Sequence, residues 1–347
     1  MLAALLEVLS AQAADHAVIL VYHHVADDTP ASTSVTPGAF ARQLEFLSAG
    51  GFRVWPLSKV LTRLASSEGL PDDVVAITFD DAYESVFTTA YPMLDERGWP
   101  FAVFVSTEYL DGHYVGFMSW EQLRTMAANG IEVGNHSKSH AHLIRREASE
   151  GKNAWRERVI EDIEAAQERI DAEVPLGTLQ VFAYPYGEFD RELEEVVRQL
   201  GYVALGQQSG VAGMLDSSTH IPRFPISTGF DGLDDFAIRV RARPLPVDLL
   251  SPATRVLEPG AAPPSLELRI YGDGFRRADL ACYATGQGRI SVTWRADDVL
   301  IARAERPLGA GRRKYNCTAP STTTKGVYYW YSHLWITPLP DGRWYSD

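Results

Sequence analysis

The sequence predicts an α/β region followed by an all-β region. Short apolar runs alternate with longer amphipathic segments from residue 17 to about residue 243. Shorter runs that alternate apolar with polar residues fill residues 265–347. Strands that are apolar throughout and separated by helices are typical of a parallel sheet or a barrel, here with about seven units. At roughly 100–200 residues per domain, 347 residues also favour two domains.

The first region should contain strands and helices in alternation. The expected strands are AVILVYH (17–23), VVAITFD (74–80), FAVFVS (101–106), IEVGNH (131–136), QVFAYP (180–185), YVALG (202–206) and RFPI (223–226). The expected helices cover 37–49, 84–97, 119–129, 153–171 and 190–200. Ser119 and Gln122 form a capping-box pattern at the start of the third helix.

The second region follows a proline-rich stretch. Residues 244–264 have no helical periodicity, which predicts a linker or an extended strap. Residues 265–347 are expected to form a small antiparallel β-sandwich. Its aromatic residues could present faces for stacking on sugars or could form the core of the domain and its interface, and both interpretations stay open. These residues are Tyr328, Tyr329, Trp330, Tyr331, Trp335, Trp344 and Tyr345.

Charge and hydropathy exclude several classes of protein. With 45 acidic against 32 basic residues, the net charge of −13 argues against a nucleic-acid partner. No apolar run approaches the ~20 residues that a transmembrane helix needs. We therefore expect a monomer with neither a nucleic-acid partner nor a transmembrane segment.

The N-terminus and the cysteines bear on the cellular compartment. Residues 1–16 are predicted to be the remnant of a signal peptide, because an apolar stretch ends in Ala11-Gln12-Ala13, although no basic residue precedes it and Glu7 interrupts it. The alternative is a short N-terminal helix. The only cysteines, Cys282 and Cys317, should pair in an exported domain and stay as buried thiols in a cytosolic one.

Two adjacent carboxylates, Asp80 and Asp81, end the second predicted strand. Carboxylates there are costly unless something binds them, and like charges so close need a cation or a shared proton. The carboxyl ends of strands are also where barrel enzymes place their active sites. A helix N-cap would explain one of the two carboxylates but not both.

His136 and His140 follow another predicted strand. Their i, i+4 spacing would bring both imidazoles to one face of a helical turn, where they could hold Zn²⁺ or a similar ion. His142 adds a third imidazole, and a solvent-facing histidine cluster is the alternative. Two histidines with one carboxylate form a recurring catalytic metal set, which would leave the second aspartate free as a base.

Two further strand ends carry reactive groups. Pro185 and Gly187 enclose Tyr186 in a turn that could present a backbone N–H to an oxyanion, or that could simply end the strand. His23 and His24 end the first strand, and a histidine there could act as a general acid. Since neighbouring residues of a strand point to opposite faces, only one of these two should enter the site.

Together these motifs resemble those of the polysaccharide deacetylases with the NodB homology fold, carbohydrate esterase family 4. TFDDAYES, HSKSH and FAYPYG resemble the first, second and third motifs of that family in kind, order and spacing, and the resemblance covers residues 17–243. The early Leu20-Val21-Tyr22-His23 element resembles the circularly permuted branch that deacetylates poly-β-1,6-N-acetylglucosamine. The resemblance implies a distorted (β/α)7 NodB-type barrel.

The resemblance also implies roles for residues. Asp80 would be the general base, Asp81, His136 and His140 the metal ligands, Tyr186 the source of the oxyanion N–H, and His23 the acid. His220 is the alternative acid. Ala183 stands where many members have an arginine that orients the base, so that role must fall to another residue. We further expect substrate contacts from Tyr184, Pro185 and Trp120.

These roles predict a hydrolase that removes N-acetyl groups from an extracellular GlcNAc polymer of the poly-β-1,6 type. The expected cofactor is a divalent metal, with Zn²⁺ ahead of Co²⁺, Ni²⁺ or Fe²⁺, and the expected location is periplasmic or extracellular. The alternatives are a deacetylase of peptidoglycan, chitin or acetyl-xylan, and a catalytically silent polysaccharide-binding protein.

Overall fold

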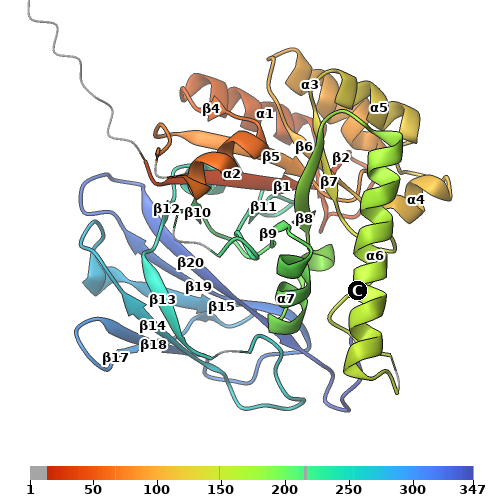
Figure 1. Cartoon of the computed structure of the whole chain (residues 1–347). Helices are drawn as coiled ribbons and strands as arrows, with labels where there is room; N and C mark the ends of the chain where they lie inside the picture. Colours follow the sequence, from red (N-terminus) through yellow and green to blue (C-terminus); the bar gives the residue numbers. More distant parts are fainter. Residues whose placement is uncertain (1–13, 67, 148, 215–216, 253, 347) are drawn as a thin grey trace, which may run out of the picture.

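A computed structural model describes residues 14–66, 68–147, 149–214, 217–252 and 254–346. Most of the predicted signal-peptide remnant, residues 1–13, lies outside the described residues. The described chain has an α/β layer followed by two mostly antiparallel sheets that pack beneath it (Figure 1). The α/β and all-β regions therefore follow the order that the sequence predicts.

The α/β region is built on a nine-stranded sheet in the order β10-β1-β5-β6-β7-β8-β9, with β11 paired to β1 and β4 paired to β5. All of its pairings are parallel except that of β10 with β1. The strands are β1 (His16–Tyr22), β4 (Arg53–Val54), β5 (Val74–Phe79), β6 (Ala102–Val105), β7 (Glu132–Asn135), β8 (Thr178–Ala183), β9 (Val203–Leu205), β10 (Ala212–Gly213) and β11 (Phe224–Pro225). A separate pair, β2 (His24–Val25) and β3 (Ser34–Val35), follows β1.

The sheet curls toward closure through residues 221–225. Ile221 forms a parallel bridge with Leu205 of β9, while Phe224 pairs with Leu20 of β1. This segment therefore connects β9, at one end of the strand order, with β1, next to the other end. The result is a distorted barrel, as expected from the resemblance.

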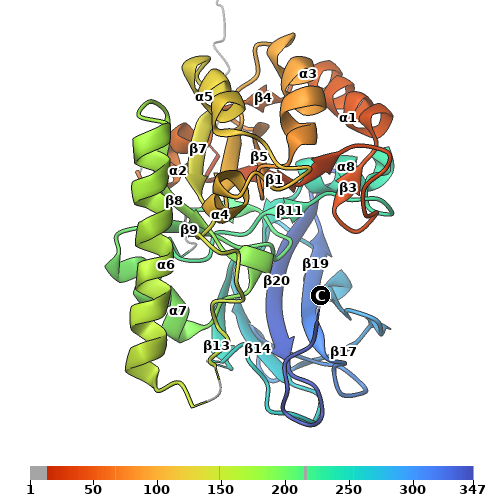
Figure 2. The same cartoon turned by 90° about the vertical axis from the view of Figure 1, so that its right-hand side faces the viewer.

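Helices cover the outside of this sheet (Figures 1 and 2). They are α1 (Pro37–Ala49), α2 (Leu57–Ala65), α3 (Tyr91–Asp95), α4 (Thr107–Asp111), α5 (Trp120–Ala128), α6 (Lys152–Glu173), α7 (Arg191–Gln199) and α8 (Leu233–Val240), with a π-helical turn at Val86–Ala90 and a 3-10 turn at Pro185–Gly187. The capping box is present at α5, where Ser119 Oγ accepts from the Gln122 N–H and the Gln122 side chain accepts from the Ser119 N–H. The sequence patterns did not predict helices α2, α4 and α8.

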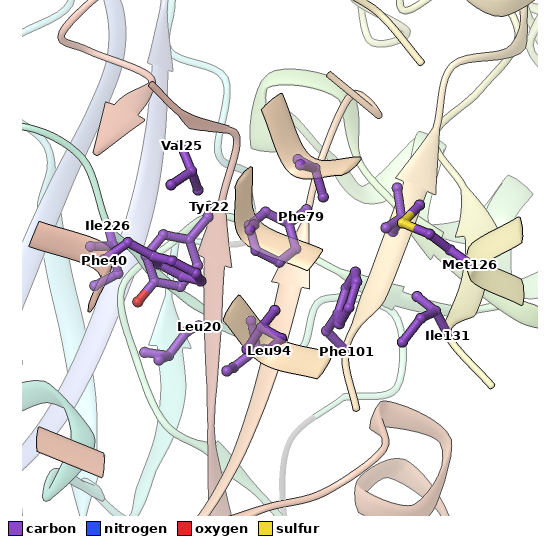
Figure 3. Packing of buried hydrophobic residues seen from close by; sticks show 14 of the residues in the cluster. Leu20, Tyr22, Val25, Phe40, Phe79, Leu94, Phe101, Met126, Ile131 and Ile226 are labelled. Carbon is purple, nitrogen blue, oxygen red and sulfur yellow. The ribbon is translucent and has the colours of Figure 1, made fainter. Parts of the chain in front are cut away.

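The barrel core has two parts because successive side chains of a strand point to opposite faces. Leu20, Tyr22, Phe79 and Phe101 point outward and pack under the surrounding helices (Figure 3). Ile19, Ala76, Phe104 and Leu205 belong to a second cluster, which Leu57, Leu61 and Leu64 of α2 complete.

The all-β region is a sandwich of two mostly antiparallel sheets. One sheet has the order β12-β20-β19-β15-β16 and the other β13-β14-β18-β17. The strands are β12 (Arg243–Pro244), β13 (Val247–Ser251), β14 (Ser265–Ile270), β15 (Ala281–Ala284), β16 (Gly288–Arg289), β17 (Ser291–Trp294), β18 (Val299–Arg303), β19 (Gly311–Pro320) and β20 (Tyr328–Thr337), with a 3-10 turn at Arg277–Asp279. Cys282 pairs with Cys317 across β15 and β19, and the two form a disulfide.

The stretch predicted as a linker contains strand β13, which pairs with β14. The edge position of β13 explains the difference: an edge strand tolerates the flanking prolines Pro246 and Pro252, which a central strand would exclude. The sandwich therefore begins well before residue 265. No helix among the described residues is long and apolar enough to cross a membrane.

The aromatic residues near the C-terminus serve the core and the interface. Trp335 is fully buried in the sandwich core. Trp330 packs edge-on against Phe224 of the barrel, and the Arg145 guanidinium lies over the rings of Trp344 and Tyr345. These contacts join the two regions and favour the structural interpretation of the aromatic cluster.

Candidate active site

The predicted site residues gather at the carboxyl ends of the parallel strands. His23 follows β1, Asp80 and Asp81 follow β5, His136 follows β7 and Tyr186 follows β8. Parallel strands bring their carboxyl ends to one edge of the sheet, which is where α/β enzymes bind their ligands. Residues far apart in sequence are thereby brought to a common site.

Asp81, His136 and His140 converge on one point. Each offers one ligand atom, and the three atoms lie within 4.8 Å of one another. The Asp81 Oδ1 atom is 3.1 Å from His136 Nε2 and 3.0 Å from His140 Nε2. Two imidazoles and one carboxylate with room for further ligands are a donor set that Zn²⁺ and related ions accept. The residues present therefore fit a divalent metal.

His136 is held in the tautomer that a metal ligand requires. Its Nδ1–H donates to the Ala183 carbonyl oxygen at 2.7 Å, which leaves the Nε2 lone pair facing Asp81. A hydrogen bond from the ring nitrogen that does not face the metal fixes the orientation of a ligating histidine. Ala183, which stands where the family often has an arginine, thus contributes through its backbone.

His140 reaches the same point from a loop, so the expectation of a helical turn at residues 136–140 is wrong. Ser137 and His140 both adopt left-handed backbone angles, with φ of 67° and 54°. The His140 N–H donates to Ser137 Oγ, and Asp162 of α6 accepts from the Lys138 N–H. These side-chain hydrogen bonds compete with helix formation and fold the loop so that both imidazoles still meet.

Asp80 is held by an arginine that the sequence analysis did not single out. The Arg223 guanidinium forms a bidentate pair with Asp80 at 2.7 and 2.8 Å, and both side chains are fully buried. Arg223 lies in the segment that closes the barrel, and it also donates to the Gly206 carbonyl. Arg223 is therefore the arginine placed to orient Asp80, the role for which Ala183 offers no side chain. One signal was available: a charged residue inside the apolar run RFPI needs a buried partner of opposite charge.

The electrostatics keep both aspartates ionised. Burial acts to raise the pKa of Asp80, but the charges of Arg223 and His136 and the hydrogen bonds from Arg223 leave it lowered. Burial would also raise the pKa of Asp81, but hydrogen bonds from His136 and His140 outweigh it. The pKa of Asp81 therefore lies well below the usual value. An ionised Asp81 suits a metal ligand, and an ionised Asp80 suits a base.

Of the two histidines after β1, His23 is the one on whose pKa both carboxylates act. Burial lowers the pKa of His23, while the charges of Asp81 and Asp80 act to raise it. His24 instead stacks on the Tyr83 ring, with centroids 3.5 Å apart, and burial lowers its pKa to about 4. One histidine enters the site and its neighbour packs beside it, as strand geometry requires.

His220, the alternative acid, lies elsewhere. Its Nδ1 contacts Glu194 of α7, and its ring stacks on Phe189 with centroids 5.5 Å apart. These partners belong to the side of the barrel that faces the sandwich. The geometry therefore favours His23 over His220.

Tyr186 occupies the turn after β8 with a left-handed backbone, φ 59° and ψ 2°. Its ring stacks on His142 with centroids 3.8 Å apart and lies 4.5 Å from the His140 ring. This contact places the turn beside the candidate metal site. Together with Asp81, Ala82, Ser137 and His140, Tyr186 is one of five non-glycine residues at the site with positive φ. Such strain is concentrated at functional sites.

The structure does not support three predicted substrate contacts. Tyr184 is fully buried, its ring packs on Phe189, and its hydroxyl donates to the Thr219 carbonyl. Pro185 is also buried. Trp120 is 7% exposed within the core and its indole N–H donates to Asp111. Tyr184 packs on the side of the sheet that faces α7, and α5 turns Trp120 toward the core, so none of the three lies open to a substrate.

Other aromatic residues stand beside the candidate metal site. The rings of Tyr109 and Phe117 stack with centroids 4.4 Å apart. The ring centroids of Tyr83 and Phe117 are 4.8 Å apart, and those of Tyr109 and His140 are 6.2 Å apart. Burial and the neighbouring Asp81 raise the pKa of Tyr83. These residues come from three separate segments, and only Tyr83, within TFDDAY, lies in a motif that the sequence analysis used.

Comparisons with known proteins agree with this geometry. Residues 67–205 match the family model described as polysaccharide deacetylase. This part of the chain is similar to the proteins of that family. The match includes Asp80, Asp81, His136, His140 and Tyr186, whereas His23 and Arg223 lie outside the matched residues.

Named relatives of the deacetylase domain share modest identity. The poly-beta-1,6-N-acetyl-D-glucosamine N-deacetylase of Escherichia coli K12 is 26% identical over 263 residues, which cover 64% of this chain and 38% of the relative. The structure of IcaB from Ammonifex degensii is 26% identical with a TM-score of 0.56, and the match covers 63% of this chain and 95% of IcaB. The deacetylase PplD from Streptococcus pyogenes, 19% identical with a TM-score of 0.58, shares the fold over 65% of this chain and 98% of PplD. The chain thus matches well under half the length of the E. coli relative.

Proposed function

We propose that the chain is a metal-dependent N-deacetylase of a GlcNAc polysaccharide of the poly-β-1,6 type. One observation carries the proposal: a buried, ionised Asp80 stands next to the converging Asp81, His136 and His140. This is the arrangement needed to activate water beside an amide. The name of the E. coli relative supports the substrate class. The Cys282–Cys317 disulfide supports an extracellular or periplasmic site of action, because disulfides persist in oxidising compartments.

Asp81, His136 and His140 would hold the divalent metal, with Zn²⁺ as the first choice. A metal bound there supplies a Lewis acid that polarises a carbonyl and lowers the pKa of water to about 7. Asp80 then accepts the proton of the attacking water, while Arg223 keeps the carboxylate ionised and aimed. The water oxygen bonds to the acetyl carbon.

The leaving amine must gain a proton before the C–N bond breaks. His23 is assigned this step because it lies where the charges of both aspartates act on it. Burial lowers its pKa, which makes the imidazolium a stronger acid. The Tyr186 N–H is assigned to donate a hydrogen bond to the acetyl carbonyl oxygen as it becomes negatively charged. The products are acetate and a free glucosamine amine.

Acetate release from poly-β-1,6-GlcNAc and from chitin pentamer tests the proposal. We expect release in the presence of added Zn²⁺, Co²⁺ or Ni²⁺, and its loss on chelation. Asp80→Asn should lower kcat about 10²- to 10⁴-fold, the range for removal of a general base. Asp80→Asn should still bind the metal, since Asp80 is not one of the three converging ligands.

The exposed Asp95→Asn, on the outer helix α3, is the matched control and should keep full activity. Greater release from chitin, or release from acetyl-xylan or peptidoglycan alone, would replace the proposed substrate with an alternative. A protein that binds metal but releases no acetate from any of these polymers would refute the proposal.

A further inference from the structure

Strand β19 of the sandwich reaches the edge of the candidate active site. Arg312 and Lys314 lie two positions apart on β19, so their side chains leave the same face of the strand. Both contact the barrel. The intervening Arg313 points away and donates to carbonyls of its own loop, at Gly309 and Ala310.

Lys314 is connected to the proposed base through one residue. Its Nζ donates to the Gln207 carbonyl oxygen at 2.7 Å, and the Gln207 Nε2 donates to Asp80 Oδ2 at 3.1 Å. Burial lowers the pKa of Lys314 to about 8, with smaller effects from Arg312 and Arg239. Lys314 is partly buried, and its ammonium group contacts the barrel through this carbonyl.

Arg312 holds the other side of the site. Its guanidinium carbon is 5.1 Å from the centre of the Tyr186 ring, and one of its nitrogens is 3.4 Å from Glu188 Oε1. Glu188 is buried. Its Oε2 also hydrogen-bonds with His142 Nδ1 at 2.9 Å, and its Oε1 accepts from the Tyr345 hydroxyl. The sandwich and its C-terminal segment therefore both bind the residue that follows the Tyr186 turn.

The two contacted loops are packed directly on each other. Gly187 has φ of +66°, and a Cβ added to it would lie 2.6 Å from the Gln207 Cβ. A shift of either loop would therefore displace the other. β19 contacts both, with Arg312 on the turn of residues 186–188 and Lys314 on Gln207.

We propose that the sandwich completes the catalytic site: Lys314 is a positioning residue that acts on Asp80 through Gln207, and Arg312 is a positioning residue for the Tyr186 turn. This inference rests on the proposed deacetylase function. It gives the sandwich a part in catalysis, in place of the role as a separate sugar-binding module that its aromatic residues suggested from sequence. A displacement of the base by about 1 Å can cost 10²-fold in rate even when the change lies far from the chemistry.

The test compares full-length variants on the polymer that the wild-type protein deacetylates. Lys314→Met keeps the length and apolar stem of the side chain and removes its donors. We expect kcat to fall about 10- to 100-fold while KM stays within about threefold, since misplacement of the base affects the transition state more than substrate binding. Lys314→Arg, which retains donors, should recover most of the loss. Bound metal per chain should stay unchanged in both variants.

Arg313→Met is the matched control, because it removes a cation from the same strand without touching the barrel loops, and its kcat should stay within about twofold of wild type. Thermal melting verifies that each variant is folded. Arg312→Met provides an independent reading of the same strand and should also lower kcat, so a failure of Lys314→Met to fold would not prevent the test.

The outcomes separate the two proposals. An active wild type with fully active Lys314→Met and Arg312→Met would refute the positioning role and leave the proposed function intact. Equal losses in Lys314→Met, Lys314→Arg and Arg313→Met would indicate a merely structural strand and would also refute it. A wild type that binds metal but releases no acetate would refute the proposed function, and this inference with it.

Discussion

The barrel and the sandwich differ in what they bury. Among the described residues, every buried aspartate, glutamate or arginine lies in the barrel, and the most deeply buried of them, Asp80 and Arg223, belong to the candidate site. The sandwich buries apolar and aromatic side chains, a disulfide and a few neutral polar groups. A buried charge costs several kcal/mol unless it is well paired. The barrel bears this cost at the candidate active site, and the sandwich does not.

The backbone shows the same difference. All the non-glycine residues of the described chain with positive φ lie before residue 243, and the site contributes Asp81, Ala82, Ser137, His140 and Tyr186. In the sandwich, positive φ values fall on glycines such as Gly286 and Gly311, which adopt them without steric cost. The barrel is thus strained where it is functional, and the sandwich provides an unstrained support.

The largest expected effect comes from removing the buried arginine. Arg223→Met leaves the Asp80 carboxylate unpaired in the barrel interior, so we expect a loss of about 3–5 kcal/mol in the free energy of unfolding at pH 7, together with loss of activity. The double variant Arg223→Met with Asp80→Asn removes both charges and should recover part of that loss. Urea unfolding of the three variants and the wild type, monitored by circular dichroism, measures the coupling.

This effect has a pH signature. In the wild type the pKa of Asp80 is lowered, so the pair contributes stability above the ordinary pKa of 3.8, and this contribution is lost as the pH falls through the folded-state value. In Arg223→Met, we expect the pKa of Asp80 to rise relative to the wild type, because burial remains and the arginine that opposes it is gone. The deficit of the variant should therefore be largest near neutral pH and shrink toward acid. A deficit that is the same at pH 7 and pH 4 would contradict a charge-based origin.

The sequence predicted the parts of the site that sit in local motifs. Asp80, Asp81, His136 and His140 follow apolar strands, and local order alone places them at a common edge of the sheet. The loop from His136 to His140 could not be predicted in detail, because its shape depends on Asp162 in a helix that comes later in the chain. The order of the two regions followed from hydrophobic periodicity.

The residues that hold the base were missed for a different reason. Arg223 contacts Asp80 from 143 residues away in sequence, and Gln207 contacts it from 127 residues away. Lys314, still further along the chain, reaches Asp80 only through Gln207. Apart from the charge of Arg223 in the apolar run RFPI, no sequence signal marks them, and their contacts depend on the closure of the barrel and the packing of the sandwich. Tyr184 and Trp120 were assigned to substrate because aromatic residues near a motif look alike in sequence whether they face a cleft or the core.

The sandwich offers the next test of the comparison. Its disulfide joins residues separated by 35 positions, and a cross-link of this span contributes about 2–4 kcal/mol, mainly by restricting the unfolded chain. Replacing Cys282 and Cys317 by Ala should therefore lower the stability of the sandwich by about that amount. Bound metal per chain should not change, because the three candidate ligands all lie in the barrel. Differential scanning calorimetry with metal analysis checks both, and the same loss in reduced wild-type protein serves as the control.

The smallest expected effect lies at the periphery of the barrel, away from buried charge and strain. Ser119 caps α5 through a reciprocal pair of hydrogen bonds with Gln122, and removing such a cap costs about 1 kcal/mol. Ser119→Ala should lower the urea midpoint accordingly and leave acetate release unchanged. The exposed Ser48→Ala, inside α1, is the matched control and should be neutral within about 0.5 kcal/mol. If Ser119→Ala instead reduced activity, the strain and charge at the strand ends would depend on the outer helices, and the separation between a costly site and an ordinary scaffold would not hold within the barrel itself.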